Sequence, residues 1–189
     1  LQQAQLVKAY GELTCFESAD LYLANFEKAK LDNANFKFAT LQSTSLTNAT
    51  LTSGNFSWAN LENADCSNSN FTDSNFYSAT LEKTNFTGAN LTNVNLQGAI
   101  IKNSCFDNVT FNNTSFLKPL NPSHSQTDIN RLHSELTFWH EQIKDHSNRR
   151  VLREAILDNL VRNTATASLG LSERMTMHDA IKNHPIFKH

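Results

Sequence analysis

The sequence is short of cysteine, glycine, proline and net charge. Its 189 residues include three cysteines, five glycines and three prolines, and the formal net charge is −2. Cys15, Cys66 and Cys105 lie far apart in the sequence, so they give neither a disulfide framework nor the spacing of a cysteine metal site. The glycines form no phosphate-binding loop and no G-x-S-x-G nucleophile motif. We therefore find no signal for a nucleotide-binding or hydrolytic enzyme.

Long hydrophobic runs are also missing. No stretch approaches the roughly 20 apolar residues that span a bilayer, so we expect no membrane span. Neither a signal peptide nor a transit peptide opens the chain. Leu1 already stands in the repeat described next, and no Met precedes it. We expect the sequence to be a fragment whose parent protein begins upstream.

What the sequence does contain is a five-residue repeat. From Leu1 to Phe116 every fifth residue is Leu, Phe or Ile, with Gly11 and Cys66 as exceptions. Two places before each of these, no residue is larger than valine. A helix needs apolar positions every 3.6 residues and a strand every 2, so a period of five excludes both as long elements. The chain must turn a corner every five residues, and four corners close a 20-residue coil.

The register of the repeat is A-N-L-x-x or A-N-F-x-x, as in Ala59-Asn60-Leu61 and Ala34-Asn35-Phe36. This register resembles the pentapeptide-repeat family over residues 1 to about 118. The resemblance implies an all-β, right-handed quadrilateral β-helix, here a solenoid of about six coils. Asparagine is frequent just before the large inward residue, and we expect its amide to bond the backbone at the corner and the equivalent residue one coil away.

The repeat ends at Phe116, and a small α-helical region follows. Two prolines in residues 119–127 mark a linker. We predict a helix from Asp128 to about Asp145 and a second from about Asn148 to Arg162. A third is predicted from Ser172 or Thr176 to Asn183. The region 128–189 either caps the last coil, covering Phe116, or begins a further domain.

Two aromatic residues break the polar pattern of the outward positions. Phe38 and Trp58 are 20 residues apart, so they should stack on adjacent coils of one face, and Tyr77 should extend the patch. With Lys37 beside Phe38, these residues are our candidate partner-binding site, because exposed aromatics on a rigid polar surface are typical of protein-binding hot spots. The alternatives are that the C-terminal helices cover this face, or that an aromatic ladder simply stabilises it. A second apolar group comprises Tyr10, Leu13, Tyr22 and Leu23, against which we expect an upstream segment to pack.

No catalytic, cofactor or metal site is predicted. His133 and His140 lie seven residues apart and could share a helix face, but no third ligand stands close by in the sequence. Arg149, Arg150 and Arg153 form a basic cluster that we interpret as a solvated helix face, which disfavours nucleic acid as a partner. We expect this fragment to be non-enzymatic, with a protein partner and no small-molecule substrate.

Two function classes remain. A β-helix followed by helices is similar in layout to the N-terminal region of secreted bacterial effectors of the HECT-like ubiquitin-ligase type. That similarity implies a module that holds a host protein or ubiquitination substrate in the host-cell cytoplasm, ahead of a catalytic cysteine further downstream in the parent protein. The alternative is a cytoplasmic, DNA-mimicking pentapeptide protein that binds or inhibits a DNA topoisomerase. The second class needs a strongly acidic rod, whereas Glu12, Asp32 and Asp73 are sparse on their face.

Overall fold

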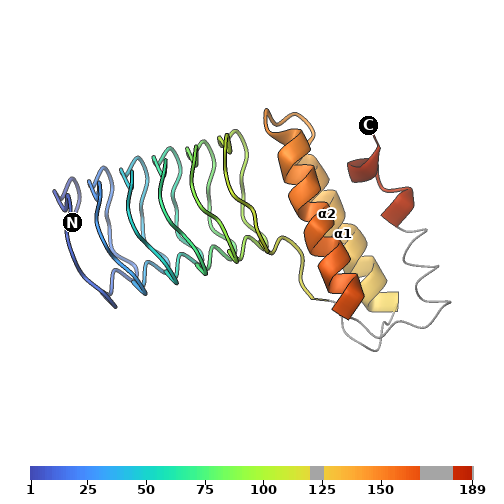
Figure 1. Cartoon of the computed structure of the whole chain (residues 1–189), viewed down its shortest axis with the longest axis horizontal. Coiled ribbons are helices and arrows are strands. Elements are labelled where there is room, and N and C mark those ends of the chain that lie inside the picture. Colours follow the sequence, from blue (N-terminus) through green and yellow to red (C-terminus); the bar gives the residue numbers. More distant parts are fainter. Residues whose placement is uncertain (120–125, 167–180, 189) are drawn as a thin grey trace. The chain divides into compact units, whose positions relative to one another are not determined.

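The computed structural model describes residues 1–119, 126–166 and 181–188. The chain forms two compact units, Leu1–Ser115 and Phe116–His189. The first is a stack of coils and the second contains the helices, as Figure 1 shows.

The first unit is built from parallel pairing between residues 20 positions apart. Nineteen bridges run from Gln5↔Asn25 to Asn95↔Ser115, one at every fifth residue. At 20 residues a coil, this unit holds just under six coils. The four-sided β-helix predicted from the repeat is therefore confirmed. Its edges are isolated bridges, and the described residues contain no continuous strand, because each five-residue edge has one pairing residue before the next turn begins.

Each corner is a tight turn of one kind. At most corners the small inward residue donates its backbone N–H to the carbonyl of the large inward residue three places before, as Ala59 does to Phe56 at 3.1 Å. The residue just before the small one has a positive φ, between 54° and 70° at every fifth residue from Gln3 to Asn113. A positive φ at the third position, with none at the second, is the pattern of a type II turn. We call this set of residues the αL column.

The core of the solenoid consists of stacked side chains. Phe36, Phe56 and Phe76 are fully buried, with ring centroids 4.8 and 4.7 Å apart along the stack. From Thr44 on, where the small inward residue is Ser or Thr, its hydroxyl donates to a carbonyl of the preceding coil, as from Thr84 to Leu61 at 2.8 Å. The interior is thus both apolar and satisfied in its hydrogen bonds.

The asparagines that precede the large inward residues form the predicted hydrogen bonds. The Asn75 Oδ1 atom accepts a hydrogen bond from the Tyr77 backbone at 3.1 Å and another from Asn95 Nδ2, one coil away, at 3.0 Å. The first bond fixes the corner and the second ties two coils together, so this column reinforces the backbone ladder.

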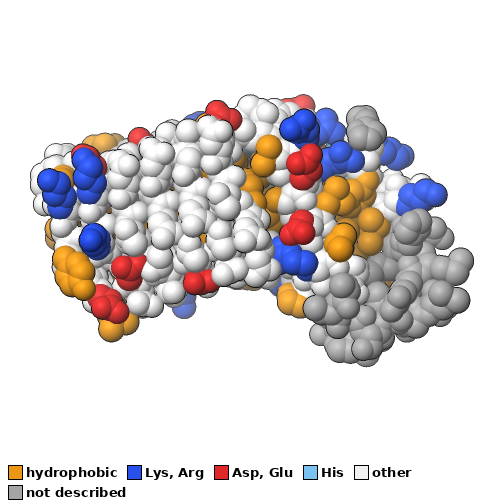
Figure 2. Space-filling view, viewed as in Figure 1, with side chains coloured by type: hydrophobic (Ala, Val, Ile, Leu, Met, Phe, Trp, Pro, Cys, Tyr) orange, Lys and Arg blue, Asp and Glu red, His pale blue; other side chains and the backbone are white. Residues whose placement is uncertain are grey.

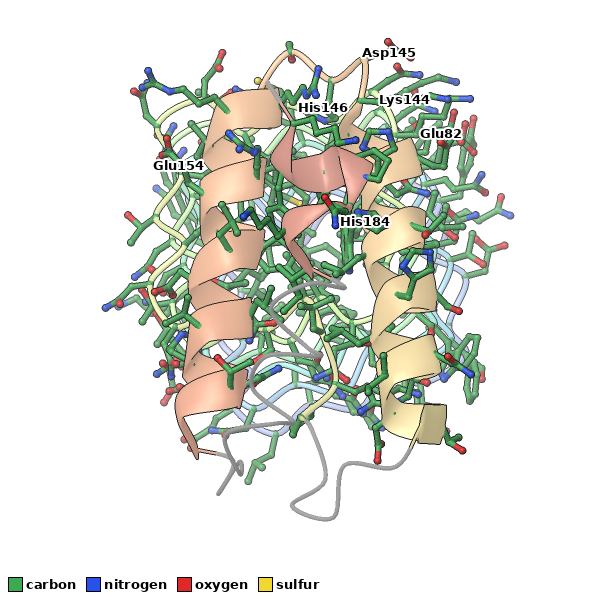
Figure 3. The ribbon with its side chains drawn as sticks, turned by 90° about the vertical axis from the view of Figure 1, so that its right-hand side faces the viewer. Glu82, Lys144, Asp145, His146, Glu154 and His184 are labelled. Atoms are coloured by element: carbon green, nitrogen blue, oxygen red, sulfur yellow. The ribbon has the colours of Figure 1, made fainter. Side chains whose placement is uncertain are left out.

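The second unit contains helix α1 (Gln126–Ile143), helix α2 (Arg149–Thr166) and the short 3-10 helix η1 (Pro185–Phe187). Helices α1 and α2 lie side by side in Figures 1 and 3. The predicted apolar stripes face inward, because Leu136, Trp139, Ile156 and Leu160 are all buried. Helix α1 begins two residues before the predicted start, and α2 continues four residues beyond the predicted end. The predicted third helix falls largely outside the described residues; of its range, Ile181 and Lys182 are helical.

The helices hold Phe116, the last residue of the sequence repeat. Trp139 packs edge-on against its ring, 5.1 Å between centroids, and donates its indole N–H to the Phe116 carbonyl at 2.9 Å. The Asn159 Oδ1 atom accepts hydrogen bonds from the backbone N–H groups of Phe116 and Leu117, at 2.9 and 2.8 Å. These contacts satisfy the buried backbone groups of Phe116 and Leu117.

Candidate protein-binding surface

The four predicted site residues lie on one side of adjacent coils. Phe38 and Trp58 occupy equivalent corners one coil apart and are 50% and 52% exposed. Lys37 and Tyr77 stand in the neighbouring outward column and are half-buried. We refer to Lys37, Phe38, Trp58 and Tyr77 as the aromatic face.

Side-chain contacts join the residues of this face in two pairs. The rings of Trp58 and Tyr77 meet edge to face, with centroids 5.7 Å apart. The Lys37 ammonium lies 4.9 Å from the centroid of the Phe38 ring, a cation–π contact. Ser57 stands between Lys37 and Tyr77 in the same column and is only 6% exposed. The face therefore consists of two contacting pairs of side chains on adjacent coils.

The backbone beneath the face is equally well defined. The Phe38 N–H donates to the Ser57 carbonyl at 3.1 Å, and the Trp58 N–H donates to the Tyr77 carbonyl at 2.9 Å. The Asn55 Oδ1 atom accepts hydrogen bonds from both the backbone N–H and the hydroxyl of Ser57. A partner meeting this face would find side chains already ordered, which limits the entropy lost on binding.

The two exposed aromatics of the aromatic face occupy the αL column. Phe38 has a φ of 59° and Trp58 a φ of 62°. Eight of the 23 residues in this column are asparagine and two are glycine, the residue types that tolerate this conformation. For a bulky side chain the left-handed region costs about 1–2 kcal/mol. Sequence reasoning missed this feature, although the asparagine content of the column was the available signal.

On the coils before and after the aromatic face, the same corner carries small or polar residues. The same corner carries Ser18 one coil before Phe38, and Ser78 and Gly98 on the two coils after Trp58. Figure 2 shows one side of the repeat unit as mostly uncharged polar side chains and backbone, with hydrophobic side chains gathered mainly near the N-terminal end. The second apolar group predicted from the sequence is also exposed, at 79% for Tyr10, 73% for Leu13, 40% for Tyr22 and 41% for Leu23.

The histidines of the second unit meet in a cluster that the sequence did not indicate. His133 and His140 of α1 are joined by His184, whose ring centroid lies 5.0 Å from that of His133 and 6.3 Å from that of His140. His184 Nδ1 accepts the Ile186 N–H at 3.2 Å, and Nε2 lies 3.1 Å from the Thr137 hydroxyl. Figure 3 shows His184 between η1 and α1.

The pKa of His184 is lowered from 6.5 to about 4, mainly by burial and to a smaller extent by repulsion from His133 and His140. The ring is therefore neutral at neutral pH, with its proton on Nε2, because Nδ1 is an acceptor. Among the residues that the structure describes, no group of three or more His, Cys, Asp or Glu side chains is arranged to hold a metal ion. Nor is any helix in those ranges long and apolar enough to cross a membrane.

Comparison with known proteins identifies the repeat. A model of the family "Pentapeptide repeats" matches eight copies, over residues 19–57, 55–93 and 74–113. A search of curated protein sequences finds no match.

Several solved structures share similarity with the chain. The pentapeptide repeat protein Rfr23 from the cyanobacterium Cyanothece 51142 is 25% identical, over 60% of this chain and 88% of that one, with a TM-score of 0.47. HetL from Nostoc sp. strain PCC 7120, involved in heterocyst differentiation regulation, is 21% identical over 61% and 63%, with a TM-score of 0.42. The plasmid-mediated fluoroquinolone resistance protein QnrB1 is 15% identical over 62% and 70%, with a TM-score of 0.40.

Proposed function

Because the chain belongs to the pentapeptide-repeat family, we propose that it is a non-catalytic protein-recognition module whose partner docks on the aromatic face. One observation carries this proposal. Phe38 and Trp58 are half exposed at corners whose backbone favours asparagine or glycine. On backbone conformation alone these corners favour asparagine or glycine, so the exposed aromatic rings point to a role beyond the turn.

Protein binding supplies that reason. Tryptophan and tyrosine dominate binding hot spots because they exclude much water at a small entropic cost. The Lys37 ammonium lies at the edge of the patch, where it is available to a carboxylate of the partner. The partner surface that fits is therefore an apolar pocket with an acidic group at its rim.

The topoisomerase alternative has less support. Residues 1–115 contain six Lys and ten Asp or Glu, a net charge of −4. Several of these acids bond within the solenoid: Asp32 accepts from the Thr52 backbone at 3.1 Å, and Asp73 from Asn93 Nδ2 at 2.8 Å. Six lysines offset part of the charge of the ten acids, so the solenoid gives a weaker DNA-like field than a continuous acidic stripe would.

A finer proposal concerns the parent protein. Its support is the layout alone, a β-helix followed by helices, which is also the layout of secreted HECT-like ubiquitin-ligase effectors. In that case the partner is a host protein or ubiquitination substrate in the host cytoplasm. Deleting residues 1–118 from the parent protein would then abolish substrate ubiquitination and leave ubiquitin loading on a downstream cysteine intact. Loss of loading itself would refute this finer proposal.

The aromatic face is tested by Trp58→Asn, which places a favoured residue in the αL column. We expect the melting temperature to hold or rise, because asparagine tolerates a positive φ. Partner affinity should fall by about 2 kcal/mol or more, roughly thirtyfold. The partner is first identified by capture on the wild-type chain in parallel with the variant, and its affinity for each is then measured with purified proteins.

The matched control is Ser53→Asn, an exposed αL-column position at another corner, with a φ of 55°. This change should alter neither stability nor affinity. If Trp58→Asn instead lowers stability by about 3–5 kcal/mol, as buried aromatic truncations do, the face is an internal packing seam and the proposal is wrong. A partner that binds both variants equally would also refute it.

A further inference from the structure

The helical unit carries a cationic pocket that the aromatic face does not involve. It has a volume of about 310 Å³ and is lined by Arg149, Arg150, Arg153 and Lys188. The three arginines lie in the first five residues of α2, and Lys188 follows η1. Lys and Arg side chains gather over the upper end of the helical unit in Figure 2. The pocket brings together residues from two segments that are distant in the sequence.

The charges of this pocket are not neutralised within the described part of the chain. Elsewhere in the unit each helix pairs cations with acids, such as Arg162 with Asp158 at 2.9 Å. Arg150 has Glu154 at 3.8 Å, but both side chains are mostly exposed, at 86% and 64%, so this pair is weak. Among the described residues, no carboxylate lies within 4 Å of Arg149, Arg153 or Lys188.

The guanidinium of Arg153 is also held in position. Its Nε and Nη2 atoms donate hydrogen bonds to the carbonyls of Ile186 and Phe187, both at 2.9 Å. Carbonyls carry no net charge, so the cation keeps its full charge, and Nη1 remains as a donor. Positive side chains at a helix start are unfavourable, because the N-terminal end of the helix dipole is itself positive. An anion in this pocket would relieve that repulsion.

We propose that this pocket binds a phosphate monoester on a phosphorylated side chain of a partner protein. Arginine forks match the oxygens of phosphate, and clustered arginines are a recurrent way to recognise phosphorylated segments. All four of the described residues that line the pocket are cationic, so an anion fits it better than a neutral or positively charged ligand.

The charge distribution argues against an extended polyanion. Nucleic acid is bound by basic residues that follow many phosphates. Here the cations form one compact group, in a chain whose net charge is −2. A single doubly charged group fits such a cluster better than a strand of phosphates or an anionic membrane surface.

The test is a nuclear magnetic resonance titration of the full chain with O-phosphoserine. Serine, and sodium chloride at matched ionic strength, serve as controls. We expect shifts in the backbone signals of Arg149, Arg150 and Arg153 with O-phosphoserine alone. The double variant Arg149→Gln/Lys188→Gln should weaken binding about tenfold, because it removes two charge-assisted contacts. Arg162→Gln, on the same helix but outside the pocket, should bind as the wild type does.

A second measurement separates the possible sources of phosphate. On an array of phosphoserine peptides, binding should exceed that to the unphosphorylated peptides about tenfold and be lost in the double variant. Equal responses to O-phosphoserine and sodium chloride would overturn the proposal. So would binding to a short single-stranded DNA or to phosphatidylserine vesicles without any response to O-phosphoserine. Circular dichroism of each variant confirms that it is folded, and Trp58→Asn should leave every one of these readings unchanged.

Discussion

Removal of the Phe56 ring is the most direct test of the solenoid core. Phe56 is fully buried and lies between two parallel rings, with Phe36 at 4.8 Å and Phe76 at 4.7 Å. Phe71 packs edge-on at 5.6 Å. The Phe56→Ala change therefore removes three aromatic contacts and leaves a cavity in the middle of a stack.

The expected loss of stability follows from these contacts. Truncation of a buried phenylalanine to alanine costs about 3–5 kcal/mol. Each aromatic pair contributes about 0.5–1.5 kcal/mol beyond area burial, so a ring with three partners belongs at the upper end, about 4–5 kcal/mol. Phe56→Leu keeps most of the volume, and we expect a loss of about 1.5 kcal/mol.

Equilibrium urea unfolding, followed by circular dichroism, measures the loss. Lys102→Ala, an exposed change in an outward column, should stay within about 0.5 kcal/mol of the wild type. Because each coil contacts only its neighbours, hydrogen exchange should accelerate most in the coils that hold Phe36, Phe56 and Phe76. If Phe56→Ala were no more destabilising than Lys102→Ala, the inward assignment of the fifth-residue column would be wrong.

Two further predictions follow from titratable groups. The lowered pKa of His184, about 4 against 6.5, means that the unfolded chain binds the proton more tightly. The stability that this ring provides should therefore be complete above pH 6.5 and decline toward pH 4, by about 1–2 kcal/mol after allowance for solvent screening. Urea unfolding followed by the helical signal should show this slope, and His184→Asn, which can still cap η1, should flatten it; an unchanged slope would refute the assignment. Burial raises the pKa of the Cys66 thiol well above its ordinary value, so a thiol reagent should label the exposed Cys15 long before Cys66 in the folded chain, and peptide mapping that found equal rates would contradict this.

The solenoid could be predicted because its information is local and repeated. A period of five leaves one arrangement of inward columns, and the burial of Leu61, Phe71 and Leu81 confirms it. Helices α1 and α2 were predictable in the same way, from their apolar stripes. Their termini differ from the predicted ones by one to four residues, because the apolar period marks the buried face of a helix better than its termini.

The contacts that sequence reasoning missed join residues that are distant in the sequence. His184 lies far from His133 in the sequence, and no periodic pattern links them. The same holds for Arg153 and the carbonyls of Ile186 and Phe187. The arginine cluster was visible in the sequence, but a solvated helix face and a pocket look alike until Lys188 is placed beside it. The positions of Phe38, Trp58 and Tyr77 followed from the register, whereas their ring contacts depend on rotamers that the register does not fix.

The αL column allows residue types at equivalent corners of the solenoid to be compared. All 23 of its residues have a φ between 54° and 70°, so large differences in residue type between corners reflect what each side chain contacts. Leu13, Leu23, Phe38 and Trp58 are the large hydrophobic exceptions. Leu13 and Leu23 stand at different corners, whereas Phe38 and Trp58 share one corner on consecutive coils. These two large residues at one corner contribute no buried core volume, yet Phe38 contacts Lys37 and Trp58 contacts Tyr77 on the same face. That concentration is expected if a partner contacts the corner.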